Sequence, residues 1–203
     1  MSNTSAFSFI SGHLCLDFVN TAGDATKQRD VDRLPAFGDA VQWARRVGIA
    51  SAGEERTLRG LAHARPTQAA ECNQHLHSLR EVIYNVLETL SKKHDPGVDA
   101  LSSVEKYIKE ALAVSHLQTS KSKPYAWIVN LHEVGMDIIR HRIALAIASL
   151  LTSADRLDIR ACEACSWLFL DPSPTKRRRW CSMAACGNRA KARRHYHAAS
   201  SRP

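Results

Sequence analysis

Four of the six cysteines in this 203-residue chain lie close together near its C-terminus. Two residues separate Cys162 from Cys165, four separate Cys181 from Cys186, and fifteen lie between the two pairs. A pair with two intervening residues forms a tight turn that directs both sulfur atoms to one point, and a second pair at short range completes a tetrahedral set. Zn²⁺ suits four thiolates because its filled d shell imposes no competing geometry. The spacing therefore predicts that these four cysteines bind one zinc ion.

A disulfide framework and an iron–sulfur cluster are the alternatives for the four cysteines. Disulfides form in oxidising compartments, and residues 1–18 have neither the basic segment nor the long apolar segment of a secretory signal. An iron–sulfur cluster also takes four cysteines, but the arginine-rich surroundings favour zinc. Because four protein ligands leave no open coordination position, the expected role of Zn²⁺ is structural rather than catalytic. The remaining two, Cys15 and Cys72, are expected to be buried as small apolar side chains.

The positive charge of the chain is concentrated in the same C-terminal segment. Residues 172–203 hold nine basic residues and no Asp or Glu, and because the whole chain carries +8, residues 1–171 carry −1. A strongly basic segment joined to a nearly neutral body indicates binding to a polyanion, of which nucleic acid is the commonest. For the charge alone, a solvated basic tail without a partner is the alternative.

The apolar segments are too short to cross a membrane. The longest predominantly apolar segment, residues 143–151, has nine residues, whereas a membrane-spanning helix needs about 20. Hydrophobic residues make up 44% of the chain and charged residues 24%, which is typical of soluble globular proteins. We therefore expect no membrane partner and a cytoplasmic protein of one or two domains.

Helical periodicity dominates the first three quarters of the chain. Apolar side chains recur at helical spacing, Ser51 and Glu54 have the spacing of a capping box, and Gly48 fits the residue after a helix. The predicted helices cover residues 37–47, 51–64, 67–91, 98–112 and 131–152. The last of these is apolar on several faces and should lie in the centre of the domain. Residues 14–19 form an apolar run that fits either a strand or the start of a helix.

Short strands are expected in two places. Residues 112–128 alternate in polarity around a turn at Lys121–Pro124, which predicts a β-hairpin. Further short strands are predicted at residues 157–159 and 167–170, on either side of the first cysteine pair.

Both ends of the chain resemble a known bacterial family. Residues 162–191 resemble the CGNR zinc finger, which takes its name from the string Cys186-Gly187-Asn188-Arg189. Residues 12–21 resemble the opening of the ABATE domain that usually precedes this finger. The family is described as stress-induced transcription regulators, a description that is itself a prediction. By their order the two motifs cover nearly all of the chain, although Pro172 and Pro174 make the finger loop stiffer than the family pattern.

The resemblance implies that the four cysteines of the family correspond to the four that the spacing selects. The periodicity and the cysteine spacing predict a mainly α fold: a helical N-terminal domain, residues 1–155, with a small β-hairpin, then a treble-clef-like finger, residues 158–200. Within the finger, a hairpin over residues 166–180 is expected to connect the two cysteine pairs, and a helix should follow Cys186.

Six basic residues of the finger are candidate contacts to DNA. They come from the segment before Cys181 and from the final helix, whose arginines can enter a major groove or lie along phosphates. These residues are Arg177, Arg178, Arg189, Lys191, Arg193 and Arg194. If about five of them contact phosphates, log K should fall with log salt at a slope of about −4 to −5. Arg179 is expected instead to pair with the thiolates or with carboxylates of the body.

Three polar residues interrupt the apolar run of the N-terminal motif. Asp17, Asn20 and Thr21 are candidates for lining a pocket for a small-molecule effector, and a helix cap or a turn is the alternative. An effector-sensing domain joined to a DNA-binding finger would be a one-component regulator. A homodimer is also a candidate state, because a single small finger buries little DNA surface.

No catalytic residues are predicted, and the chain is not expected to be an enzyme. His132-Glu133 begins like the metalloprotease motif HExxH, but Met136 occupies the second histidine position. Walker loops, G-x-G-x-x-G and the H-x-E of zinc deaminases are not found in the sequence. The alternative function is a zinc-stabilised interaction module that docks on an acidic protein partner.

Overall fold

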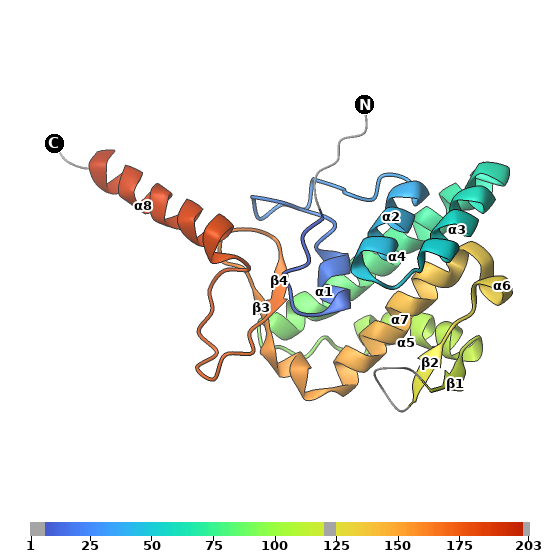
Figure 1. Cartoon of the computed structure of the whole chain (residues 1–203). Coiled ribbons are helices and arrows are strands. Elements are labelled where there is room, and N and C mark those ends of the chain that lie inside the picture. The colour runs from blue at the N-terminus through green and yellow to red at the C-terminus, as the bar shows by residue number, and fades with distance from the viewer. Residues whose placement is uncertain (1–6, 120–124, 201–203) are drawn as a thin grey trace.

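The computed structural model describes residues 7–119 and 125–200 (Figure 1). Its helices are α1 (Leu14–Val19), α2 (Phe37–Val47), α3 (Ala52–Ala64), α4 (Pro66–Ser91), α5 (Val98–Ala113), α6 (Leu131–Val134), α7 (Ile138–Thr152) and α8 (Asn188–Ser200). Its strands are β1 (His116–Gln118), β2 (Ala126–Ile128), β3 (Ile159–Ala161) and β4 (Leu168–Leu170). The prediction of a mainly α fold with small β-hairpins is confirmed.

The 26-residue helix α4 is the central element of the molecule. It contacts α1, α2, α3, α5 and α7 as well as the finger strands β3 and β4. Its buried stripe includes Leu76, Leu79, Ile83 and Leu87, each at most 1% exposed. The predicted apolar stripe therefore forms the centre of the core.

Several helix ends fall where the capping signals place them. The helix α2 ends at Gly48, whose φ of +88° lets its N–H bond the carbonyl of Ala44. The hydroxyl of Ser51 accepts a hydrogen bond from the amide of Glu54, and the Glu54 carboxylate accepts one from the Ser51 amide, which starts α3. At the N-terminus of α4, Pro66 occupies the first turn, where its missing N–H costs no hydrogen bond.

The prediction of one continuous helix over residues 131–152 is wrong, because the helix is broken at Gly135. This glycine has φ +56° and ψ −132°, a backbone conformation that side chains with a Cβ strongly disfavour. The short α6 precedes the break, a 3₁₀ turn follows it, and α7 then continues to Thr152. Only α7 is the central apolar helix, and it packs against α1 and α5.

The N-terminal motif forms α1 rather than a strand. Five of its six residues are buried, and the His13 side chain accepts a hydrogen bond from the Cys15 amide at its start. Cys15 and Cys72 are buried in the core, as expected, and burial raises the pKa of the Cys72 thiol to about 11. Both therefore act as apolar core residues.

The predicted hairpin after α5 is confirmed. Strands β1 and β2 are antiparallel, and Leu117 pairs with Trp127. The predicted turn at residues 121–124 lies outside the described residues. None of the described helices is both long and apolar enough to cross a membrane.

The finger hairpin differs from the prediction. Strand β4 pairs with β3, on the other side of the first cysteine pair, and the segment before Cys181 forms no strand. Two prolines of that segment, Pro172 and Pro174, have no N–H for a ladder. The carboxylate of Asp171 also accepts hydrogen bonds from the amides of Ser173 and Arg178, which folds the chain into a loop instead.

Candidate metal centre and nucleic-acid interface

The structure brings the four C-terminal cysteines to one point. Their sulfur atoms all lie within 4.8 Å of one another, and all four residues are buried. The Cys165 and Cys181 sulfurs are 3.7 Å apart, and those of Cys181 and Cys186 are 3.6 Å apart. With Zn–S bonds of about 2.3 Å, the sulfurs of a tetrahedral site are about 3.8 Å apart. The cluster therefore fits a structural Zn²⁺ site with four thiolate ligands.

Two local turns direct these sulfurs inward. The first pair lies in the turn between β3 and β4, where the amide of Cys162 donates to the carbonyl of Trp167 at 2.9 Å. Of the second pair, Cys186 lies in a wide π-type turn, Met183–Gly187, and Cys181 lies just before it. The Ser182 hydroxyl caps this turn by accepting a hydrogen bond from the amide of Ala185. Within that turn, a Cβ on Gly187 would lie 2.5 Å from the sulfur of Met183. Only glycine fits this position without a shift of its neighbours.

Interactions within the cluster shift the thiols in opposite directions, because hydrogen bonding to Cys162 raises the pKa of the Cys165 and Cys181 thiols. Hydrogen bonds from Cys165 and Cys181 lower the pKa of the Cys162 thiol, and the thiolate is the form that binds a metal. The guanidinium of Arg189 donates to the Cys186 sulfur at 3.2 Å. Four thiolates and Zn²⁺ sum to two negative charges, so a cation in this position stabilises the loaded site.

Of the six predicted DNA contacts, two are directed into the finger itself. Arg189 is held at the Cys186 sulfur, as described above. Arg178 donates to the carbonyl oxygens of Trp180, at 2.9 Å, and Cys181, and its guanidinium lies 4.5 Å from the centre of the Phe169 ring. Both arginines therefore hold the second cysteine pair in place.

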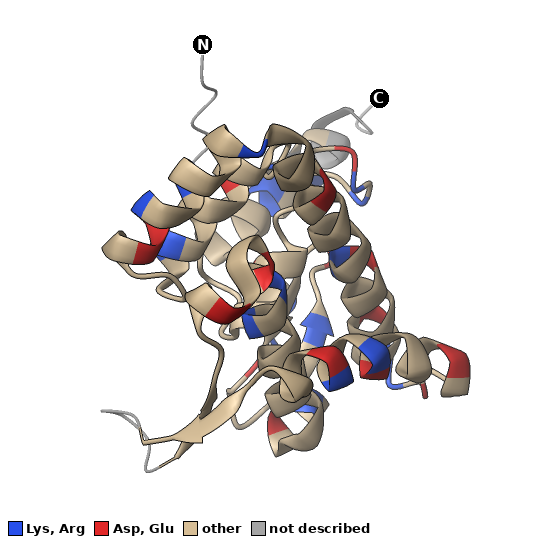
Figure 2. Ribbon diagram, turned by 90° about the vertical axis from the view of Figure 1, so that its right-hand side faces the viewer, with Lys and Arg blue, Asp and Glu red and all other residues tan. Residues whose placement is uncertain are grey.

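The other four predicted contacts are exposed, as Arg178 also is. Arg177 lies in the loop before Cys181, and Lys191, Arg193 and Arg194 lie on α8, which projects away from the helical domain (Figure 1). We refer to these four residues together as the basic face, although Lys191 and Arg193, two positions apart on α8, lie on different sides of that helix. On the helical domain, by contrast, basic and acidic residues are interspersed (Figure 2).

A cavity of about 370 Å³ lies beside the basic face. Its lining includes Arg193 and Arg194 of α8 together with Glu163, Arg179 and Trp180. The Arg179 guanidinium donates to both carboxylate oxygens of Glu163, at 2.7 and 2.5 Å, and lies 5.0 Å from the centre of the Trp180 ring. Arg179 therefore pairs with a carboxylate, as expected. The carboxylate belongs to Glu163 of the finger, whereas a carboxylate of the helical domain was the expected partner.

The three candidate effector-binding residues instead bond to protein atoms. Asp17 accepts hydrogen bonds from the amide and the hydroxyl of Ser11; burial raises the pKa of its carboxyl, and these bonds oppose the rise. Asn20 is the C-cap of α1 and forms two bonds to the backbone of Leu168, donating at 2.8 Å and accepting at 3.0 Å. The hydroxyl of Thr21 donates to Phe18 and accepts from Arg80. The structure thus supports the cap and turn alternative, and an effector at this position stays a prediction.

The N-terminal segment fastens the finger to the helical domain, which the sequence does not reveal. Trp167 donates to the carbonyl of Gly23 at 3.2 Å, and the amide of Leu170 donates to the carbonyl of Ser11 at 2.8 Å. From α4, the hydroxyl of Tyr84 donates to the carbonyl of Ser166 at 3.2 Å. In the sequence, the polarity of Asn20 within an apolar run indicates that its side chain has a polar partner. It does not reveal which partner, because Leu168 lies 148 residues away.

The acidic residues of residues 131–141 pair with neighbouring side chains. Glu133 bonds His116 and Asn130, Asp137 pairs with Arg140, and the break at Gly135 separates them. Farther along, His141 is buried in α7.

Comparison with known families agrees with this architecture. The model of the ABATE family, described as "Putative stress-induced transcription regulator", matches residues 12–154. The model of the CGNR zinc finger matches residues 158–199 and includes all four clustered cysteines. No curated protein matches the chain. Since the first match covers more than half of the chain, this protein belongs to the ABATE family and carries a C-terminal CGNR zinc finger with a structural Zn²⁺ site.

Proposed function

We propose that this protein is a DNA-binding transcription regulator in which Zn²⁺ holds the finger together and the basic face contacts nucleic acid. The observation that carries the proposal is the group of four exposed basic residues on a finger whose C-terminal segment, residues 172–203, has no acidic residue. Such a surface attracts a polyanion, and the one carboxylate that lines the neighbouring cavity, that of Glu163, is paired with Arg179. The family description supports the same assignment.

Within this proposal the six basic residues have two roles. Arg177, Lys191, Arg193 and Arg194 contact phosphates directly. Arg178 and Arg189 act indirectly, since they hold the zinc loop from which α8 starts. Arg193 and Arg194 line the cavity beside Arg179, whose guanidinium is paired with Glu163, so these two arginines are the ones in the cavity that contact a phosphate.

We also propose how the chain is organised around this function. Residues 1–155 form the helical domain and residues 158–200 the finger, in a non-enzymatic cytoplasmic regulator that binds DNA as a homodimer. A dimer would double the phosphate contacts, which a single small finger needs for stable binding.

A salt titration with mixed-sequence duplex DNA tests the proposal. Fluorescence anisotropy of the zinc-loaded chain should give a log K against log salt slope of about −4 if the four residues of the basic face contact phosphates. The double variant Arg193→Glu/Arg194→Glu should reduce the magnitude of that slope by about 2. Zinc content measured on the same samples shows that the finger is intact.

A matched control separates the basic face from overall charge. The double variant Arg56→Glu/Lys106→Glu makes the same charge change at positions of the helical domain outside the finger. It should bind DNA with the slope of the unchanged protein. Equal losses in both double variants, or no binding at low salt with zinc bound, would contradict DNA recognition by this face. A complex with an acidic protein partner would then be the function to pursue.

A further inference from the structure

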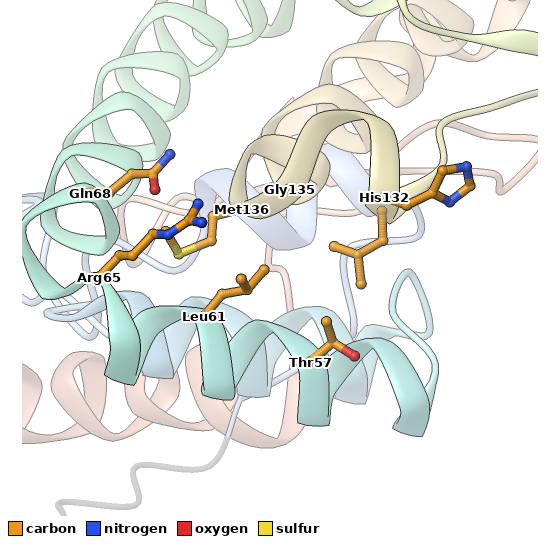
Figure 3. Close-up of a pocket in the computed structure, with 8 residues that line it drawn as sticks. Thr57, Leu61, Arg65, Gln68, His132, Gly135 and Met136 are labelled. Atoms are coloured by element: carbon orange, nitrogen blue, oxygen red, sulfur yellow. The ribbon is translucent and has the colours of Figure 1, made fainter.

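A cavity of about 500 Å³ lies in the helical domain, far from the residues proposed to contact DNA. It is formed between α3, the start of α4 and the break between α6 and α7 (Figure 3). Its lining residues are Thr57, Leu61, Arg65, Gln68, Leu131, His132, Gly135 and Met136. The volume falls within the range of about 300–1,000 Å³ that is typical of small-molecule sites.

Arg65 places a charged group at one end of this cavity. Figure 3 shows Arg65 and Gln68 together at one end, beside Met136, while Leu61 and Thr57 project from α3 along its length. The His132 ring is turned away from the other lining side chains. A ligand with one polar end and an apolar body matches this arrangement.

The guanidinium of Arg65 is available for such a polar end. Within the described residues its side chain forms no hydrogen bond or ion pair. Most arginines of the helical domain have a carboxylate partner. These pairs are Arg29–Glu81, Arg33–Asp24, Arg45–Glu55, Arg59–Glu55, Arg80–Asp32, Arg140–Glu110 and Arg142–Glu54. A carboxylate in the cavity would give Arg65 the two parallel hydrogen bonds that a guanidinium fork forms best.

The cavity lies where the chain departs from a regular helix. Gly135, at the break, has nothing within 4 Å of the position a Cβ would take, so no side chain fills this part of the cavity. Met136 follows it and is 4% exposed, with a flexible thioether that adapts to ligands of different shape. A helix continuing through residue 135 would not leave this opening.

We propose that the cavity binds a small monocarboxylate with an apolar tail. Its carboxylate pairs with Arg65 and accepts a hydrogen bond from the Gln68 amide, and its tail lies along Leu61, Leu131 and Met136. This site is separate from the basic face, so the proposal does not depend on DNA binding.

Calorimetric titration with octanoate tests the site on the zinc-loaded full chain. Octanoate should bind with one-to-one stoichiometry, and Arg65→Gln should weaken the binding about fivefold, the upper end for an ion pair with an exposed arginine. The uncharged analogue octan-1-ol should bind the unchanged protein as weakly as octanoate binds the Arg65→Gln variant. In two-dimensional NMR spectra, the amide signals of Gln68 and Gly135 should shift with octanoate.

Two further variants keep the test decisive. Arg56→Gln removes the same charge from α3 outside the cavity, and it should change the octanoate affinity less than about twofold. Thr57→Trp places a large side chain at the lining of the cavity without removing a charge, and it should weaken the binding of octanoate. No octanoate binding below its micelle-forming concentration would overturn the proposal. Equal weakening by Arg56→Gln and Arg65→Gln would overturn it as well.

Discussion

At the scale of single residues, the buried polar side chains explain how the two parts of the chain are joined. Asn20 is 2% exposed and satisfies both the N–H and the C=O of Leu168 in β4. A buried backbone group that loses its partner costs about 1–3 kcal/mol. One amide side chain therefore secures the strand that follows the first cysteine pair.

Replacing Asn20 tests this role. The variant Asn20→Ala leaves both backbone groups of Leu168 without their partner and should lower the free energy of unfolding by about 2–4 kcal/mol. Urea unfolding of the zinc-loaded protein measures the change. The control Asn85→Ala alters an exposed asparagine of α4 and should stay within about 0.5 kcal/mol. Equal stability of the two variants would show that Asn20 is dispensable.

A second buried residue, His141, makes the stability depend on pH. Burial and then the charge of Arg140 lower the pKa of its imidazole, and its Nδ1 has no hydrogen-bond partner among the described residues. In the unfolded chain the pKa of the imidazole is about 6.5. Below this pH the unfolded state therefore binds more protons than the folded state. Stability should therefore fall as the pH drops from about 6.5, by at most about 1.4 kcal/mol per pH unit.

The variant His141→Leu isolates this contribution from that of the zinc cysteines. Both proteins share the metal site, so the difference between their free energies of unfolding reports on residue 141 alone. Measured by urea unfolding between pH 7 and pH 5 with excess Zn²⁺, the variant should lose less stability than the unchanged protein. Parallel curves would contradict the assignment.

At the scale of elements, helix ends are encoded locally and can be tested with two glycines. Gly48 ends α2 at φ +88°, whereas Gly60 lies inside α3, and at neither glycine does any atom lie within 4 Å of the position a Cβ would take. The variant Gly48→Ala should cost about 1 kcal/mol, because alanine disfavours this φ. The variant Gly60→Ala should stabilise the protein by about 0.4–1 kcal/mol. Thermal unfolding should show opposite signs, and equal signs would mean that local conformation does not decide the outcome.

The sequence predicts well those features that depend on local interactions, as the ends of these helices do. The ends of α2 and α3 depend on Gly48, Ser51 and Glu54, which act within one turn, and the zinc cysteines are close in sequence. Hence these features could be predicted. The pairing of β4 with β3 and the direction of Arg178 depend on which backbone groups the folded loop presents. Such choices are settled by tertiary contacts, so periodicity and spacing do not reveal them.

At the scale of the whole molecule, α4 connects the two proposed sites. Its first turns carry Gln68 at the cavity, and Tyr84, near its other end, bonds the finger at Ser166. At about 1.5 Å per residue, its 26 residues span about 39 Å. The finger is thus packed on the same helix that organises the core, and its stability should not be independent of the helical domain.

Removing zinc tests this coupling. Without the metal, four thiols must share a buried cluster, and the turns that bond to Asn20, Gly23 and Tyr84 lose the ion that holds them. Chelation should therefore increase amide hydrogen exchange in α1 and in residues 20–33 of the helical domain, as well as in the finger. Helix α5 has no bond to the finger among these contacts, and the core it shares with α7 should keep more of its protection. Restoring Zn²⁺ should reverse the change, whereas loss of protection confined to the finger would mean that the two parts fold independently.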